Sequence, residues 1–266
     1  MSRIEITSNP TLVVSGRGTI ARQHIDRGTL IHTELPLIMV KVERGKSKTG
    51  RALHQFYQSQ EHPNSRLLID AVNALSPPEA IAFNNLFAPA PIAGALPLTQ
   101  RQEIVARFRH NAWGIDKPNA YLVVYELISS LNHSCVPNAV VDIWNEDPEG
   151  DTIAPLGQVR LIATRPIPEG SEIFLNYYTD QRYEDHTVRI PLLQADYGFW
   201  CTCSGCHPDN AAIDAAERAA ASQYHEILAT DPPLTTPEIR RRIERMEVYI
   251  HLLQHLGVWD AELSEA

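Results

Sequence analysis

The stretch LNHSCVPNA, residues 131–139, decides how the rest of the sequence is interpreted. It places an Asn-His pair directly before Ser134 and Cys135, and it follows the apolar segment AYLVVYELISS at 120–130. Cysteine is scarce in this chain, with 4 among 266 residues, and the other three stand together at 201–206. The question is why one cysteine lies so far from the rest, beside polar residues at the end of a buried segment.

The remote cysteine is a candidate for the fourth ligand of a metal site. CTCSGC at 201–206 offers three thiols, and a structural zinc ion takes four ligands in a tetrahedron. Cys135 would complete the set from a distance, while His207 is a local competitor because imidazole also binds zinc. The alternative is that all four are ordinary reduced thiols.

Composition sets the broad class. Hydrophobic residues make up 44% and charged residues 21% of the chain, as in globular proteins. No apolar run is long enough to span a membrane, and MSRIEITSNP at the start does not resemble a signal peptide. We therefore expect an intracellular protein, in the nucleus or cytoplasm, with no membrane contact. The net charge of −9 argues against direct nucleic-acid binding, and it tolerates a basic partner without requiring one.

The pattern of apolar residues predicts a mixed α+β chain. Short strands are expected within 12–42, with a turn at Asp26-Arg27-Gly28, and again within 139–144 and 157–178. Helical spacing over 51–76 is interrupted by Pro63, and Thr99 suits the N-cap of a further helix. Two more helices are predicted at 211–229 and 237–256, the second with an apolar stripe that includes Ile243 and Tyr249.

Five sequence blocks, in this order, resemble the SET-domain lysine methyltransferases: GRGTIARQHIDRGTLI (16–31), NAWGI (111–115), NHSCVPNA (132–139), IPEGSEIFLNYY (167–178) and YGFWCTCSGC (197–206). The spacing over 182–206 is most similar to the SMYD branch of that family. SMYD proteins carry a MYND zinc finger after the first block, whereas residues 41–110 here contain no cysteine. The resemblance therefore implies a SMYD-like chain without the MYND finger.

The resemblance also implies a fold. We expect a β-rich SET domain in which the Asn-His-Ser-Cys strand threads under a neighbouring segment in a pseudoknot-like way. The expected parts are N-terminal SET strands (1–44), a helical insert in place of the finger (45–110), the SET core (111–180), a post-SET zinc segment (181–208) and a C-terminal helical hairpin (209–266). In this arrangement Cys135 completes the zinc site with Cys201, Cys203 and Cys206.

Members of the family bind S-adenosylmethionine (SAM), and the matched positions imply which residues contact it here: Gly16, Arg17, Gly18, Asn111, Asn132, His133, Tyr177 and Phe199. Glycine lets a ligand approach the backbone closely. Each position also has a simpler interpretation: a tight turn for the glycines, a helix C-cap for Asn111, local hydrogen bonds for the Asn-His pair, and core packing for Phe199.

Tyr177 matches the tyrosine that the family uses in catalysis, at the end of GSEIFLNY. A free lysine amine is mostly protonated at neutral pH, so the site must favour the neutral amine and orient it. The resemblance implies that Tyr178, Tyr197 and Trp200 line the lysine channel; core packing is the alternative for these three.

The function implied is SAM-dependent methyl transfer to a lysine of a protein substrate, a histone or another basic protein. Two alternatives stay open. One is an enzyme of the same fold acting on a small-molecule amine, and the other is a non-catalytic module that binds SAM or a partner. A retained Tyr177 counts against the last, because a scaffold has no need of that phenol.

Overall fold

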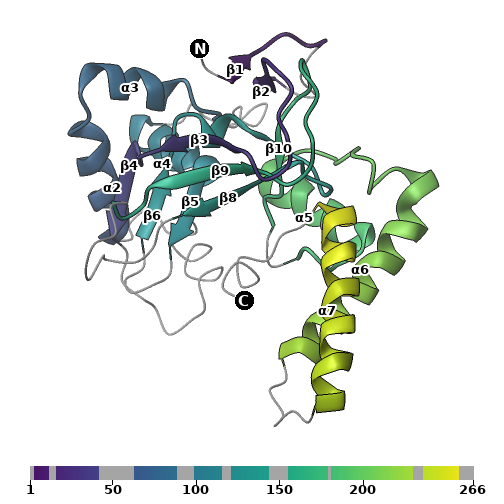
Figure 1. Ribbon diagram of the computed structural model, residues 1–266. Coiled ribbons are helices and arrows are strands. Elements are labelled where there is room, and N and C mark those ends of the chain that lie inside the picture. The colour runs from purple at the N-terminus through teal and green to yellow at the C-terminus, as the bar shows by residue number, and fades with distance from the viewer. Residues whose placement is uncertain are drawn as a thin grey trace. The chain divides into compact units, whose positions relative to one another are not determined.

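The structure is a computed structural model, drawn in Figure 1. It describes residues 3–11, 16–41, 63–88, 99–115, 121–143, 155–178, 181–229 and 236–257. The chain forms two compact units. The first unit comprises residues 1–31, 131–141 and 162–266, and the second comprises 32–130 and 142–161. The boundaries inferred from the sequence at 44, 110, 180 and 208 stay predictions.

The second unit is built on a three-stranded antiparallel sheet of order β4-β6-β5. Its elements are β4 (Ile38–Lys41), α2 (Pro63–Asn73), α3 (Pro77–Asn84), α4 (Gln100–Asn111), β5 (Ala112–Ile115), β6 (Tyr121–Val124) and the 3-10 helix η1 (Ile128–Ser130). Leu68, Phe83 and Phe108 come from the three helices and pack with Val124 in one apolar core. This core supports the strand that leads, through η1, into residue 131.

The helices of the second unit begin where local chemistry allows. Thr99 caps α4, as predicted, because its hydroxyl oxygen accepts a hydrogen bond from the Gln102 amide at 3.3 Å. Ser76 and Glu79 form the equivalent capping box of α3. The helical spacing predicted over 51–76, with an interruption at Pro63, is described only from that proline onward, and Pro63 is the first residue of α2. A proline suits that position because the first turn of a helix leaves its N–H groups unpaired anyway.

The first unit holds two small sheets. β1 (Ile4–Thr7) pairs antiparallel with β2 (Gly18–Ala21), and β7 (Asn132–His133) pairs parallel with β10 (Phe174–Leu175). A third sheet has the order β3-β9-β8, formed by Leu30–Glu34, Val159–Ala163 and Ala139–Ile143. The boundary between the two units falls inside each of these three strands.

Two tight turns connect the strands of the first unit, and the one at Gly28 was predicted. Gly28 and Gly170 each have φ of 78°, which glycine adopts without a steric penalty. The Gly28 amide donates to Ala163 O, and the Gly170 amide donates to Ala21 O, each at 2.8 Å. The turns therefore fix β2 beside the segment that precedes β10.

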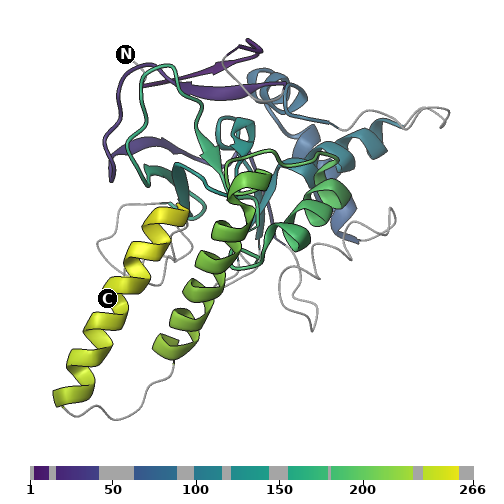
Figure 2. The same ribbon diagram turned by 90° about the vertical axis from the view of Figure 1, so that its right-hand side faces the viewer.

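The last three helices also belong to the first unit: α5 (His186–Tyr197), α6 (Pro208–Ala229) and α7 (Thr236–Leu256). Figures 1 and 2 show α6 and α7 side by side along most of their length, which confirms the predicted helix pair. Tyr249 and Leu253 are buried against α6, but Ile243 is 52% exposed. The apolar stripe of α7 is thus buried toward its C-terminal end and open to solvent at Ile243.

Some sequence predictions fall outside the described residues, namely helical spacing before residue 63 and strand character at 12–15. Among the described residues, no helix is long and apolar enough to cross a membrane.

A glycine substitution tests how the end of α7 is held. Gly257 follows α7 with φ of 70°, and a Cβ there would overlap the Pro137 carbonyl oxygen and the Arg165 guanidinium. An alanine in the left-handed region lowers the free energy of unfolding by roughly 1–2 kcal/mol by itself. Gly257→Ala should lower it by about 1–3 kcal/mol more, because the added Cβ overpacks the site. Urea unfolding of the two proteins measures the difference.

Gly28→Ala is the matched control, because its φ is 78° and no atom lies within 4 Å of the position that a Cβ would occupy. If both variants lose the same free energy of unfolding, α7 is not held against Pro137 at its end.

Candidate functional site

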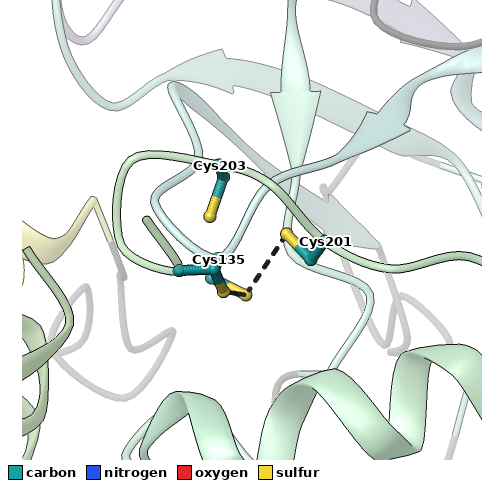
Figure 3. Close-up of side chains that lie close together, drawn as sticks. Cys135, Cys201 and Cys203 are labelled. Atoms are coloured by element: carbon teal, nitrogen blue, oxygen red, sulfur yellow. Dashed lines mark hydrogen bonds between the residues drawn. The ribbon is translucent and has the colours of Figure 1, made fainter. Parts of the chain in front are cut away.

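The four cysteines meet in the first unit. Their sulfur atoms all lie within 4.8 Å of one another, and Cys135, Cys201 and Cys206 are buried. Figure 3 shows Cys135 beside Cys201 and Cys203, the last two on the segment that follows α5. The structure thus brings the remote cysteine to the other three. His207 does not belong to this group; its exposed ring lies 3.5 Å from the Asp209 carboxylate.

The sulfur spacing fits a single metal ion. Two thiolates bound to one zinc ion at about 2.3 Å, at a tetrahedral angle, have sulfurs about 3.8 Å apart. The observed separations are 3.9 Å between Cys135 Sγ and Cys201 Sγ, and 3.5 Å between Cys135 Sγ and Cys206 Sγ. The donor set is therefore of the right chemistry and size for a closed structural zinc site.

A buried ion-pair triad lies against the cysteine cluster. Asp214 on α6 accepts from Arg189 Nη2 at 2.8 Å and from Arg218 Nε at 2.9 Å, and all three side chains are almost fully buried. Arg218 Nη2 also donates to the Cys135 carbonyl oxygen at 2.7 Å, and Arg189 Nη2 lies 3.8 Å from Cys206 Sγ. Two cations share one carboxylate here, so the triad places a net positive charge next to the sulfurs.

Asn132 connects the glycine-rich block to β10. Its side-chain amide donates to the Arg17 carbonyl oxygen at 3.2 Å and to Glu172 Oε1 at 2.6 Å. Gly18 begins β2, and the exposed Gly16 has φ of 52°, with no atom of the described residues within 4 Å of the position that a Cβ would occupy. The Gly-Arg-Gly segment is thus fixed to Asn132 and leaves space beside its first glycine.

His133 lies between the cysteine cluster and Tyr177. Its Nε2 is 3.2 Å from Cys135 Sγ, and its Nδ1 accepts a hydrogen bond from the Tyr177 amide at 3.1 Å. Burial lowers the pKa of the imidazole to about 4, although the nearby Cys203 sulfur acts in the opposite direction. The ring is therefore neutral at physiological pH.

Tyr177 is a half-buried, neutral phenol. Its hydroxyl donates to the Leu131 carbonyl oxygen at 2.7 Å, and burial raises the pKa of the phenol well above its usual value. Its ring packs against Tyr197 and His133, with centroids 4.9 Å and 5.1 Å away. Because the hydroxyl proton is already donated, the oxygen can offer only its lone pairs to a further group.

The other predicted aromatic residues differ in environment. Phe199 lies 5.9 Å from the His133 ring, between centroids, and Tyr197 is in contact with both Tyr177 and Tyr178. The Tyr178 hydroxyl donates toward the Asp196 carboxylate and lies 3.1 Å from Leu192 O, so it fastens α5. Trp200 is 64% exposed. The channel roles of Tyr178, Tyr197 and Trp200 stay predictions.

Asn111 belongs to the second unit, at the end of α4. Its amide group donates to Phe87 O at 2.8 Å and to Arg107 O at 2.6 Å. Both of its N–H groups therefore act within that unit. Its role toward a cofactor stays a prediction that would rest on the amide oxygen or the backbone.

Several residues of the site were not predicted from the sequence as functional: Asn138, Glu172, Arg189, Asp214 and Arg218. Asn138 Nδ2 donates to Glu172 O at 2.9 Å, and its Oδ1 accepts from the Phe174 amide at 2.8 Å. The sequence did contain one signal for Asp214 and Arg218. They stand four positions apart on an otherwise alanine-rich helix, a spacing at which an acidic and a basic side chain can pair. Nothing local indicated that this pair would be buried.

Comparison with known proteins gives consistent matches. The SET domain family profile matches residues 16–178, more than half of the chain. The chain is 36% identical over 89 residues to the histone-lysine N-methyltransferase ATXR2 of Arabidopsis thaliana, which covers 34% of this chain and 17% of that protein.

Two further relatives align over similar lengths. One is the histone-lysine N-methyltransferase SET5 of Saccharomyces cerevisiae, at 34% identity over 93 residues, covering 34% of this chain and 15% of the relative. The other is the protein-lysine N-trimethyltransferase SMYD5 of Gallus gallus, at 30% identity over 118 residues. This alignment covers 42% of this chain and 26% of the relative. The matched region thus spans about a quarter or less of each relative's length.

Removing the shared carboxylate tests the buried triad. Asp214→Asn leaves two buried guanidinium groups without a counter-charge, so the free energy of unfolding should fall by about 3–5 kcal/mol. Asp142→Asn is the matched control, because Asp142 pairs with Arg160 at 3.0 Å on the surface and should matter by about 1 kcal/mol or less. If denaturant titrations show similarly small losses of unfolding free energy for Asp214→Asn and Asp142→Asn, solvent reaches the two buried arginines and the prediction is wrong.

Proposed function

This chain belongs to the SET-domain family, and from that premise we propose that it transfers a methyl group from SAM to the side-chain amine of a lysine in a protein substrate. The observation that carries the proposal is the placement of Tyr177. The residue that the family uses in catalysis is half-buried, neutral and fixed through its hydroxyl to the backbone beside Asn132.

The state of Tyr177 supports a positioning role. A phenol with a raised pKa does not remove a proton from a lysine ammonium at neutral pH. Its oxygen can instead accept a hydrogen bond from the amine, because its own proton is donated to Leu131 O. A neutral amine held in this way keeps its lone pair for attack, and such orientation can lower a barrier by several kcal/mol. The rings of Tyr197 and Phe199 also favour the developing ammonium.

SAM supplies an electrophilic methyl group on a sulfonium sulfur. The residues proposed to hold it are Gly16, Arg17, Gly18, Asn132, His133, Tyr177 and Phe199, together with Asn111. The open space beside Gly16 supports a close ligand approach there, because any larger residue would fill it and would be strained at φ of 52°. His133 uses both ring nitrogens within the protein, so its contact with the cofactor would come from its main chain.

A lysine-bearing protein is the proposed substrate. Two of the relatives are named histone-lysine methyltransferases and one a protein-lysine trimethyltransferase. The net charge of −9 suits a basic partner such as a histone, since opposite charge favours encounter. We also propose that Cys135, Cys201, Cys203 and Cys206 hold a structural zinc ion, supported by the sulfur spacing.

Methyl transfer tests the proposal directly. The protein is incubated with SAM labelled in the methyl group and with histones, a lysate protein fraction and a low-molecular-weight fraction. Label should enter protein lysines, and Tyr177→Phe should lower kcat about tenfold to a thousandfold while changing KM less, since the hydroxyl acts mainly in the transition state. The variant should lose about 1–3 kcal/mol of stability, because the carbonyl of the buried Leu131 loses this donor.

Tyr178→Phe is the matched control, since its hydroxyl bonds to α5 and not to Leu131. It should lower stability more than kcat. Label in the small-molecule fraction alone would favour a small-molecule amine as substrate. SAM binding without transfer to any fraction would favour a non-catalytic module.

Metal removal tests the zinc site. Freshly purified protein should contain about one zinc per chain, and a strong chelator should release it, lower the melting temperature and weaken SAM binding, because metal binding supports local folding. Cys135→Ser should reproduce these losses, whereas Ser204→Ala, within the same loop, should not. Absence of zinc from the native protein by elemental analysis would refute the site.

A further inference from the structure

We propose that His133 is a positioning residue that links the cysteine cluster to Tyr177, donating a hydrogen bond from Nε2 to Cys135 Sγ and accepting one at Nδ1 from the Tyr177 amide. The inference rests on the proposed zinc site and deepens the proposed function. It concerns the imidazole side chain, which the family resemblance did not use.

The hydrogen-bond partners fix the tautomer of the ring. A backbone N–H can only donate, so the Tyr177 amide, 3.1 Å from Nδ1, requires a lone pair on that nitrogen. Because Nδ1 holds this lone pair, the ring proton is on Nε2. Nε2 faces Cys135 Sγ at 3.2 Å, which is a short N–H···S contact. No other arrangement of a single proton satisfies both partners.

Metal loading changes the strength of the bond to sulfur. A cysteine that binds zinc is a thiolate and carries negative charge, whereas a free thiol is a weak acceptor. The N–H···S bond is therefore stronger when the cluster holds metal. Donors around a metal's ligands commonly orient them in this way. Arg218 Nη2 holds the Cys135 carbonyl at 2.7 Å, so the residue is fixed through its backbone as well as its sulfur.

The effect reaches Tyr177 through a short, continuous path. His133 lies opposite Leu175 in the β7-β10 pair, and the Ser134 amide donates to Leu175 O at 2.9 Å. Its ring holds the Tyr177 amide, and the Tyr177 hydroxyl returns to Leu131 O on the same segment. A ring fixed by the metal-bound sulfur thus fixes the backbone of Tyr177 two residues beyond β10.

The first experiment reads the proton directly. The protein is loaded with cadmium-113 in place of zinc and labelled with nitrogen-15 in histidine. We expect His133 to be protonated at Nε2 and that proton to show scalar coupling to cadmium across Cys135 Sγ. A proton on Nδ1, or an Nε2 proton without coupling to cadmium, overturns the proposal. The measurement needs no substrate, so it stands even if methyl transfer fails.

Two variants separate the two halves of the link. His133→Asn offers an oxygen near the position of Nδ1 and no donor toward Cys135; His133→Gln offers an amide donor near the position of Nε2 and no acceptor for Tyr177. Cobalt(II) in the metal site reports on the sulfur through its thiolate absorption, and methyl transfer reports on Tyr177.

We expect His133→Asn to shift the cobalt absorption and weaken metal binding about 10–100-fold. His133→Gln should leave the absorption near that of the wild type and lower kcat more than it raises KM. If the two variants change both readouts equally, in proportion to their loss of stability, His133 is only a packing residue and the link is refuted.

Discussion

Buried polar groups need partners, and this constraint connects residues 131–138 to distant parts of the first unit. An unpaired buried donor or acceptor costs about 1–3 kcal/mol. Three polar side chains of the segment have partners elsewhere in the chain: Asn132 pairs with Arg17 O and Glu172, His133 with the Tyr177 amide, and Asn138 with the backbone on both sides of Ile173. His133 and Ser134 also bond within the segment, to Cys135 Sγ and to the Val136 amide. The segment therefore positions its neighbours as well as itself.

The C-terminal helices contribute to the site through charge. Arg218 and Asp214 are on α6 and Arg189 is on α5, and together they contact the backbone of Cys135 and approach Cys206 Sγ. With zinc bound as we propose, the ion and its four thiolates would carry a net charge of −2, and the triad would add +1 beside them, so the buried charges would partly compensate. Helices α5 and α6 are thus electrostatically part of the site, whereas Tyr249 and Leu253 of α7 contribute apolar packing.

The sequence allowed the family, the helix pair and the cysteine cluster to be predicted, because each depends on motifs or on local periodicity. Thr99 as a cap and Gly28 as a turn residue are equally local. The burial of Arg189 and Arg218 was not predictable, since arginine is usually exposed and only the tertiary fold supplies Asp214 and the Cys135 carbonyl. The same holds for Ile243, which fits an apolar stripe but extends beyond the contact with α6.

The pairing partners of the central segment are remote along the chain, and this has a consequence for the order of assembly. Asn132 bonds to Arg17 across 115 positions, and Arg218 bonds to Cys135 across 83. Long loops must close before such contacts contribute, so folding rates fall as contact order rises. During synthesis Asn132 and His133 emerge before Glu172, Tyr177 and Arg218 exist. Until residue 218 has left the ribosome, the polar segment lacks some of its partners. We therefore expect the nascent chain to depend on chaperones.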